Sequence, residues 1–159
     1  MIIVCSAIIL IFFSIQVFSF VSIFQLSPEG IKEVQNYPIV SLLLAARNEE
    51  ELIIRSLTAI SALEYPQDKI EVLIGNDASS DNTANLVKEY IKDKPQFKLF
   101  SIKKTIGKGR GKANVLAHLA HQASGEYYFI TDVDVKLHPL WIKALLQEFT
   151  EHVGIVSGT

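Results

Sequence analysis

The hydrophobic and polar positions divide the chain into an apolar N-terminal stretch and a longer region of alternating strand and helix patterns. No charged residue precedes Glu29, and residues 1–24 are almost all aliphatic, aromatic or small. As a helix this stretch would be about 36 Å long, which exceeds the roughly 30 Å hydrocarbon core of a bilayer. It lacks the basic start and the small-residue cleavage site of a signal peptide. We therefore predict a transmembrane helix over residues 1–26, followed by a polar connector over residues 27–38.

The charges on either side of this stretch indicate its orientation. No Lys or Arg precedes it, whereas Lys32 and Arg47 follow it. Positive residues are enriched on the cytoplasmic side of membrane spans. We therefore expect a membrane protein whose C-terminal part lies in the cytoplasm.

Residues 39–159 alternate between short apolar runs and amphipathic stretches with helical spacing. Continuous apolar runs of this kind are typical of strands covered on both faces of a parallel sheet. The predicted strands are residues 39–45, 70–74, 97–102 and 126–131, with a further strand beginning at 154–156. The predicted helices are residues 48–65, 81–91, 112–123 and 139–152. This alternation predicts an α/β domain with a mostly parallel sheet and helices on both faces, which is a Rossmann-like nucleotide-binding architecture.

Polar clusters follow three of the predicted strands, at the sheet edge where open α/β sheets bind ligands. The clusters are 46–49, 76–81 and 132–134. In the third cluster, strand alternation points Asp132 and Asp134 to the same side. Mg²⁺ is commonly held by one or two carboxylates together with the phosphates of its substrate. The Asp-x-Asp pattern therefore predicts a metal-bridged nucleoside diphosphate.

Several residues of the first two clusters have either a ligand role or a helix-capping role. Asn48 is placed to cap the first helix, with Glu51 three residues later. Glu49 either positions the nucleoside or favours the first turn of its helix through the dipole. The Asp77 carboxylate can accept a hydrogen bond from a base or a ribose hydroxyl. We assign the capping of the second helix to Asp81 with Thr83, and ligand contact to Asp77.

A basic, glycine-rich loop over residues 103–112 precedes the third helix. It carries five cations and three glycines, so a phosphate there would meet side-chain charge, backbone N–H groups and the helix dipole together. The loop matches neither the P-loop nor the dinucleotide-binding glycine pattern. We assign ligand contact in this loop to Lys112 and Arg110.

Composition narrows the classes of function. The chain has 159 residues, is 49% hydrophobic, carries a net charge of -2 and contains one cysteine. These values argue against a disulfide scaffold and against a nucleic-acid partner. His118 and His121 lie three residues apart on one predicted helix, but a zinc site needs three or four converging ligands, and no third ligand motif accompanies them.

The motifs in residues 40–50, 75–83, 111–114 and 124–134 together resemble the donor-binding half of family 2 glycosyltransferases. The resemblance covers residues 39–159. It implies the GT-A fold, a nucleotide-diphospho-sugar donor and a Mg²⁺ or Mn²⁺ ion at the Asp-x-Asp motif. It also implies that the enzyme transfers the sugar to an acceptor hydroxyl, in a reaction that requires the metal and inverts the configuration at the sugar. The implied acceptor is a lipid, a polysaccharide or a protein.

Position by position, the resemblance implies that Asp77 contacts the base, Lys112 the nucleotide region, Asp132 the ribose or the metal shell, and Asp134 the metal itself. The predicted metal ligands are thus Asp132 and Asp134. The predicted substrate-binding residues are Ala46, Asn48, Glu49, Asp77, Arg110, Lys112 and Asp132.

The chain also departs from the family pattern. Asn76 stands where an aspartate is common, and Ala117 stands where many members have asparagine. In this family the general base and most acceptor-binding residues lie beyond the position of Thr159. We therefore expect an N-terminal, donor-binding fragment of a longer membrane enzyme, with no catalytic base of its own.

Two other functions remain open from the residues. The chain is alternatively a membrane-tethered module that binds nucleotide sugars without catalysis. A nucleotidyltransferase also combines a Rossmann-like sheet, a metal-binding aspartate and basic loops. It would, however, be expected to place its glycine-rich segment directly after the first strand, where residues 46–49 stand here.

Overall fold

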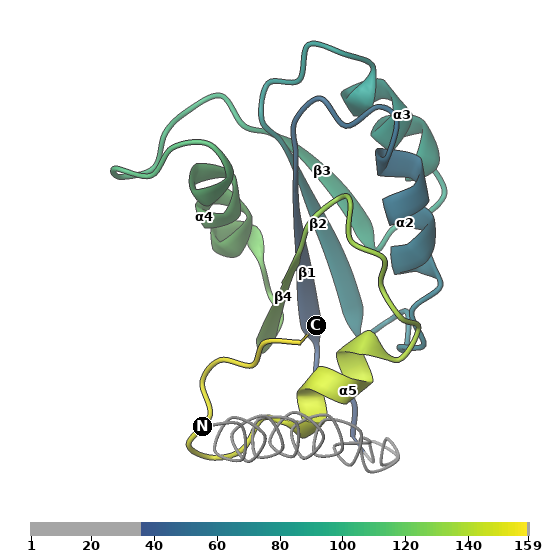
Figure 1. The fold of residues 1–159 in the computed structure, drawn as a ribbon, viewed down its shortest axis with the longest axis vertical. Helices are drawn as coiled ribbons and strands as arrows, with labels where there is room; N and C mark the ends of the chain where they lie inside the picture. The colour runs from purple at the N-terminus through teal and green to yellow at the C-terminus, as the bar shows by residue number, and fades with distance from the viewer. Residues whose placement is uncertain (1–35, 159) are drawn as a thin grey trace, which may run out of the picture. The chain divides into compact units, whose positions relative to one another are not determined.

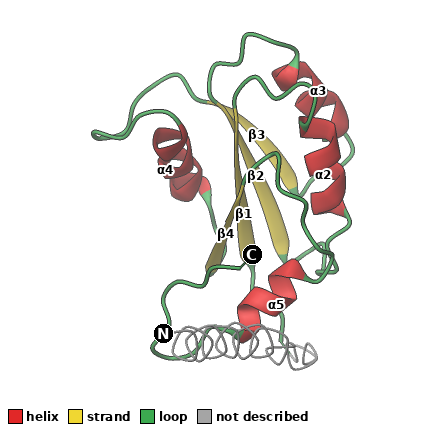
Figure 2. Cartoon of the chain, viewed as in Figure 1, coloured by secondary structure: helices red, strands yellow, loops and turns green. Residues whose placement is uncertain are grey.

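The computed structural model describes residues 36–158. In this part of the chain, a parallel sheet carries helices on both faces (Figures 1 and 2). The strands, in the spatial order β3-β2-β1-β4, are β1 Val40–Ala46, β2 Ile70–Asn76, β3 Phe97–Ser101 and β4 Tyr127–Thr131. The helices are α2 Ile53–Ser61, α3 Thr83–Tyr90, α4 Lys112–Gln122 and α5 Trp141–Gln147. The parallel α/β architecture expected from the sequence is confirmed.

The predicted membrane helix over residues 1–26 lies outside the described residues, as does all but the end of the connector. Within residues 36–158, none of the helices combines the length and apolar character required to cross a bilayer. The membrane anchor therefore stays a prediction.

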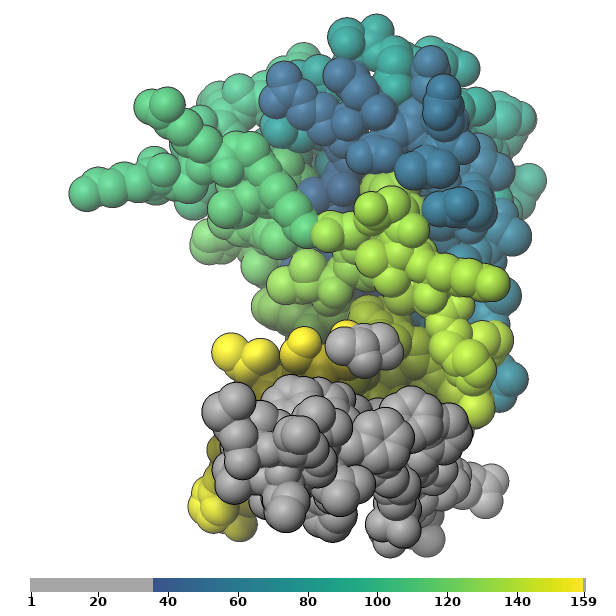
Figure 3. All heavy atoms as spheres, viewed as in Figure 1, coloured from purple at the N-terminus to yellow at the C-terminus, as the bar shows by residue number. Residues whose placement is uncertain are grey.

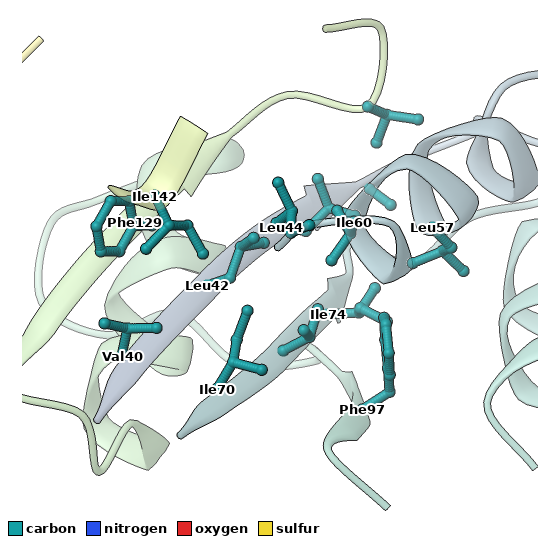
Figure 4. Packing of buried hydrophobic residues seen from close by; sticks show 14 of the residues in the cluster. Val40, Leu42, Leu44, Leu57, Ile60, Ile70, Ile74, Phe97, Phe129 and Ile142 are labelled. Atoms are coloured by element: carbon teal, nitrogen blue, oxygen red, sulfur yellow. The ribbon is translucent and has the colours of Figure 1, made fainter. Parts of the chain in front are cut away.

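The central strand β1 is buried on both faces, which explains why all of its residues except Ser41 are apolar. Leu42 and Leu44 are fully buried and belong to a core that also contains Leu57 of α2 and Ile142 of α5 (Figure 4). Leu43 points to the opposite face, where it belongs to the smaller core beneath α4. The sheet is thus covered by α2, α3 and α5 on one face and by α4 on the other.

The parallel register brings the carboxyl ends of three strands together. Ala46 at the end of β1 pairs with Asn76 at the end of β2, and Leu44 pairs with Thr131 at the end of β4. The polar clusters that follow these strands consequently meet at one edge of the sheet.

A glycine on β2 determines how closely α4 approaches the sheet. A Cβ atom at Gly75 would overlap a methyl group of Val115 and would contact Leu119 within 3.4 Å. Because Gly75 has no side chain, α4 packs directly on β2, and this packing places the first residue of α4 beside the ends of the strands.

Two predictions about the start of the first helix are wrong, one on its capping residue and one on the position at which it begins. Asn48 does not cap the first helix: it has a left-handed backbone (φ 56°), and its Oδ1 accepts a hydrogen bond from the backbone N–H of Ser80 at 2.8 Å. Helix α2 instead begins at Ile53, after Leu52, which makes no side-chain cap. The Asn48 side chain is therefore used to join the loops that follow β1 and β2.

The C-terminal elements also differ from the prediction. Helix α5 ends at Gln147, whereas the sequence pattern extended it to residue 152. Residues 154–156 form no strand, and Ile155 is 90% exposed. A strand requires a hydrogen-bonded neighbour, and within the described part of the chain this segment pairs with none of the four strands. An apolar run by itself was therefore insufficient evidence for a strand.

A buried carboxylate joins the strands at their amino ends, opposite the sheet edge that carries the polar clusters. No feature of the sequence had indicated it. Glu71 on β2 is 8% exposed. Its Oε1 accepts hydrogen bonds from Ser41 Oγ (2.7 Å) and from the backbone N–H of Ser124 (2.6 Å), and its Oε2 accepts one from Lys98 Nζ (3.2 Å). Burial by itself raises the pKa of Glu71, but the hydrogen bonds from Ser124, Ser41 and Lys98 lower it overall. Glu71 thus connects three strands to the turn between α4 and β4.

Candidate functional site

A cleft of about 450 Å³ lies at the carboxyl ends of β1, β2 and β4. Figure 3 shows this region, where the segments from β1 (blue), α4 (green) and the loop after β4 (yellow-green) lie next to one another. The predicted site residues that line the cleft are Ala46, Glu49, Asp77, Lys112, Asp132 and Asp134. The structure therefore brings together residues from four separate parts of the sequence.

The two carboxylates of the Asp-x-Asp motif enter the cleft because the residue between them is held in the core. Val133 is 4% exposed, whereas Asp132 and Asp134 are both exposed and line the cleft. The backbone oxygen of Asp134 accepts a hydrogen bond from Arg55 Nη2 at 3.3 Å, which ties the loop to α2. Within residues 36–158, the Asp134 carboxylate itself has no hydrogen bond or ion pair.

Each of the other two aspartates in the cleft has a cationic partner. Lys112 Nζ donates a hydrogen bond to Asp132 Oδ1, and about half of each side chain is exposed. Arg47 Nη1 lies 3.5 Å from Asp77 Oδ2, with 65% of the Arg47 side chain exposed. Lys112 is the first residue of α4, and Gly111 before it has a φ of +54°, a conformation that glycine adopts without strain.

The charges of the cleft favour a cation. Its lining contains four carboxylates, from Glu49, Asp77, Asp132 and Asp134, and two cations, from Arg47 and Lys112, so its net formal charge is -2. Among the described residues, no three His, Cys, Asp or Glu side chains form a cluster that would hold a metal. The donor set is therefore unlike that of an all-protein metal cage. It fits a Mg²⁺ or Mn²⁺ ion that completes its coordination with substrate phosphates and water.

The loops after β1 and β2 are joined by hydrogen bonds that decide which residues face the cleft. The backbone N–H of Glu49, a residue that lines the cleft, donates to Thr83 Oγ1 at 2.8 Å. Asp81 Oδ1 accepts hydrogen bonds from Thr83 N (3.0 Å) and Thr83 Oγ1 (2.6 Å), so the predicted contact between Asp81 and Thr83 is present, although the N-cap residue of α3 is Asn82, which makes no side-chain cap bond. These bonds lower the pKa of Asp81 even though desolvation acts to raise it. Asn48 is not among the residues that line the cleft.

A second crevice, of about 630 Å³, adjoins the cleft and shares Arg47, Asp77 and Gly111 with it. Its other wall is the basic loop between β3 and α4, which contributes Lys103, Lys104 and Arg110 and projects from the rest of the described fold (Figures 1 and 3). Arg110 therefore lies in this crevice and not among the residues that line the cleft.

A buried asparagine holds the basic loop against α4. Asn114 is 6% exposed; its Oδ1 accepts a hydrogen bond from the backbone N–H of Ile106 (2.7 Å), and its Nδ2 donates to the carbonyl of Lys104 (3.0 Å). His118 Nε2 lies 2.7 Å from the same carbonyl. Asn114 lies in the motif over residues 111–114, but no role of its own was predicted for it. The available signal was an asparagine in the first turn of a predicted helix, where its side chain can bond to nearby backbone groups.

We expect the Asn114→Ala variant to release the basic loop without unfolding the domain. The substitution removes two hydrogen bonds that hold the loop, so the loop should open more often, by roughly a factor of ten. Trypsin cleavage after Lys104 and Lys108, followed by mass spectrometry, measures the effect. Asn85→Ala, which removes an exposed asparagine on α3, is the matched control. Equal cleavage rates in the two variants would show that Asn114 does not hold the loop.

Comparisons with known proteins agree with this geometry. The family model described as "Glycosyl transferase family 2" matches residues 41–159. The chain is 34% identical over 107 residues to the "Probable glycosyltransferase YdaM" of Bacillus subtilis (strain 168), which is 67% of this chain and 25% of that protein. It is 35% identical over 128 residues to a poly-beta-1,6-N-acetyl-D-glucosamine synthase of Staphylococcus epidermidis, which is 79% of this chain and 29% of that protein.

A solved structure shares the fold. It is the mannosyltransferase PcManGT from Pyrobaculum calidifontis in complex with GDP-Man and Mn²⁺, which matches with a TM-score of 0.62 and 28% identity. The match covers 71% of this chain and 32% of that one. The chain thus spans only about a quarter to a third of the length of these three proteins.

Proposed function

The chain belongs to glycosyltransferase family 2, and from this premise we propose that it forms the donor-binding part of an enzyme that transfers a sugar from a nucleotide-diphospho-sugar to an acceptor hydroxyl. The observation that carries the proposal is the meeting of Asp77, Lys112, Asp132 and Asp134 in one cleft at the strand ends. The fold match to a mannosyltransferase solved with GDP-Man and Mn²⁺ supports it.

In this proposal the nucleotide lies along the two adjoining crevices. Asp77, which borders both, accepts hydrogen bonds from the base or ribose, and the basic wall with Arg110 lies on the same side. Lys112 contacts the diphosphate near the N-terminus of α4, where the backbone N–H groups and the helix dipole also favour an anion. Ala46, at the end of β1, and Glu49, in the loop after it, line the part of the cleft that faces the nucleotide. Asn48 holds this loop in place through its hydrogen bond with Ser80.

We propose that Asp134, with Asp132, holds a Mg²⁺ or Mn²⁺ ion together with the diphosphate. The net negative charge of the cleft repels a free diphosphate, and a divalent cation offsets that charge. When bound, the ion would act as a Lewis acid that stabilises the charge developing on the departing nucleoside diphosphate. The residues of this chain then orient the donor, and the acceptor hydroxyl attacks the opposite face of the sugar with inversion.

The attack on the sugar requires a general base that takes the proton of the acceptor hydroxyl. We assign that base, and the acceptor site, to a part of the whole protein outside this chain, since the chain matches only 25% and 29% of the two curated relatives named above. We further propose that the apolar residues 1–26 anchor the protein in a membrane, with the donor site on the cytoplasmic side.

Binding of the donor tests the proposal. In titration calorimetry with Mn²⁺, we expect the protein to bind UDP-sugars or GDP-sugars and the Asp77→Ala variant to bind about tenfold or more weakly, because a hydrogen bond to a charged group is lost. Asp68→Ala, which removes an exposed carboxylate remote from the cleft, is the control and should bind as the wild type does. If the protein binds neither UDP-sugars nor GDP-sugars, the proposal is refuted. Binding without sugar transfer by the complete protein would favour the non-catalytic module.

A further inference from the structure

The ion pair between Lys112 and Asp132 occupies the place where the proposed function puts a divalent cation. Lys112 Nζ donates to Asp132 Oδ1, while the neighbouring carboxylate of Asp134 has no partner within the described residues. Both aspartates line the same cleft. A single ammonium group therefore offsets part of the negative charge that a divalent ion would otherwise offset.

From this arrangement we infer that Lys112 is an internal counter-ion, which competes with the divalent cation for Asp132 and turns to the donor diphosphate when the cation displaces it. The inference rests on the proposed function, because it takes Asp132 and Asp134 as the metal ligands. It adds that the chain itself couples metal binding to donor binding through one side chain.

The backbones on both sides of this ion pair are held in place, so only side chains need to move. The start of α4 is fixed by Val115, which is fully buried against the sheet, and by the hydrogen bonds of Asn114. Asp132 lies between Thr131 and Val133, which are 6% and 4% exposed. The side chains of Lys112 and Asp132 are themselves about half exposed, so water can solvate the ammonium group as it leaves the carboxylate. A flexible four-carbon stem allows that movement.

The charges give the exchange its direction. Without a cation, the carboxylates of the cleft repel one another, and Lys112 offsets one of them. A divalent ion at Asp132 and Asp134 brings twice the charge and repels the ammonium group. The released ammonium group remains next to the N-terminus of α4, where a diphosphate is also stabilised. Because linkage is reciprocal, the diphosphate then strengthens cation binding by as much as the cation strengthens diphosphate binding.

The test measures Mn²⁺ binding directly, by the electron paramagnetic resonance signal of free Mn²⁺, in the full chain with and without UDP or GDP. We expect Lys112→Met to bind Mn²⁺ alone about three- to tenfold more tightly than the wild type, since it removes a half-exposed competing ion pair and a nearby positive charge. In the same variant, the gain in Mn²⁺ affinity caused by the nucleotide should shrink. Lys112→Arg keeps the competing charge and should behave as the wild type does.

Lys108→Met is the matched control, because it removes the same charge from the loop at a residue that lines neither crevice. Tighter Mn²⁺ binding by both methionine variants would show a general effect of net charge and would overturn the inference. Unchanged Mn²⁺ affinity in Lys112→Met would also overturn the inference about Lys112. In that case the proposed function would still hold, provided that the wild type binds Mn²⁺. If the wild type binds no Mn²⁺ with either nucleotide, the proposed metal site fails and the inference fails with it.

Discussion

Replacing Asp134 with alanine is expected to lower the rate of sugar transfer by the complete protein by about 100-fold or more, with the fold intact. Several kcal/mol of stabilisation of the leaving diphosphate would be lost with the metal, and each 1.4 kcal/mol corresponds to about tenfold in rate. The fold should survive because the Asp134 side chain is exposed. The hydrogen bond from Arg55 goes to its backbone oxygen, which alanine retains.

The measurements are the initial rate of transfer at saturating Mn²⁺ and the thermal unfolding of the same variant. Asp93→Ala removes an exposed carboxylate from the connection between α3 and β3 and should leave both quantities unchanged. Transfer by the wild-type protein at an undiminished rate in the presence of a metal chelator would refute the metal assignment. If the Asp134→Ala variant unfolds at a lower temperature than the wild type, its lower rate of transfer would instead be explained by a loss of folded protein.

Replacing Glu71 with alanine is expected to lower the free energy of unfolding by about 3 kcal/mol. The change leaves the hydroxyl of the buried Ser41 without its acceptor, and an unsatisfied buried group costs about 1–3 kcal/mol. The backbone N–H of Ser124 also loses its acceptor, but Ser124 is an exposed residue, so water replaces part of that bond. The ion pair with Lys98 adds little, because the Lys98 side chain is 52% exposed. Urea denaturation followed by circular dichroism measures the difference.

Glu71→Gln is the matched control for this substitution, since it keeps a hydrogen-bond acceptor of the same shape and should be less destabilising. It also tests the pH dependence. The folded-state pKa of Glu71 is lowered, so its stabilising contribution is present above the ordinary value of 4.5 and is lost as the pH falls through the lower, folded-state pKa. We expect this acid-induced loss of stability to be smaller in Glu71→Gln. An identical decline with pH in both proteins would show that Glu71 is not its source.

The elements of the fold were predictable where local pattern and tertiary burial demand the same residues. β1 is apolar at every position that either core covers, so its sequence alone indicated a strand buried on both faces. The same logic failed at residues 154–156, because an apolar run indicates burial only when another element covers it, and Ile155 is almost fully exposed.

Capping was less predictable, because it depends on which polar partner is nearest in space. Asn48 is an acceptable helix cap by sequence, but the loop after β2 brings the N–H of Ser80 within 2.8 Å of its side chain. Asp81 and Thr83 are two residues apart in the sequence, so their bond was foreseeable. The short distance along the chain made the contact between Asp81 and Thr83 predictable, whereas the contact between Asn48 and Ser80 spans 32 residues.

For the candidate site, six of the predicted residues line the cleft, whereas Asn48 and Arg110 do not, and Arg47 lines it without having been predicted. The sequence did not indicate how these residues are paired. Asp77, Lys112, Asp132 and Asp134 follow from their positions after strands and before a helix. The pairing of Lys112 with Asp132 joins residues 20 positions apart, and Glu71 contacts residues 30 and 53 positions away. No local pattern records such contacts, since they depend on the strand register and on the packing of α4 over Gly75.

The parallel α/β class, the sheet edge at which the polar clusters gather and the family whose motifs they resemble could all be predicted from the sequence, because hydrophobic periodicity is a local property and strands joined by helical crossovers run parallel. Only the tertiary structure shows which carboxylates of the cleft have a cationic partner among residues 36–158, where Asn48 and Asn114 direct their hydrogen bonds, and that Glu71 is buried. Those outcomes depend on distances between side chains that only the packed sheet and helices establish.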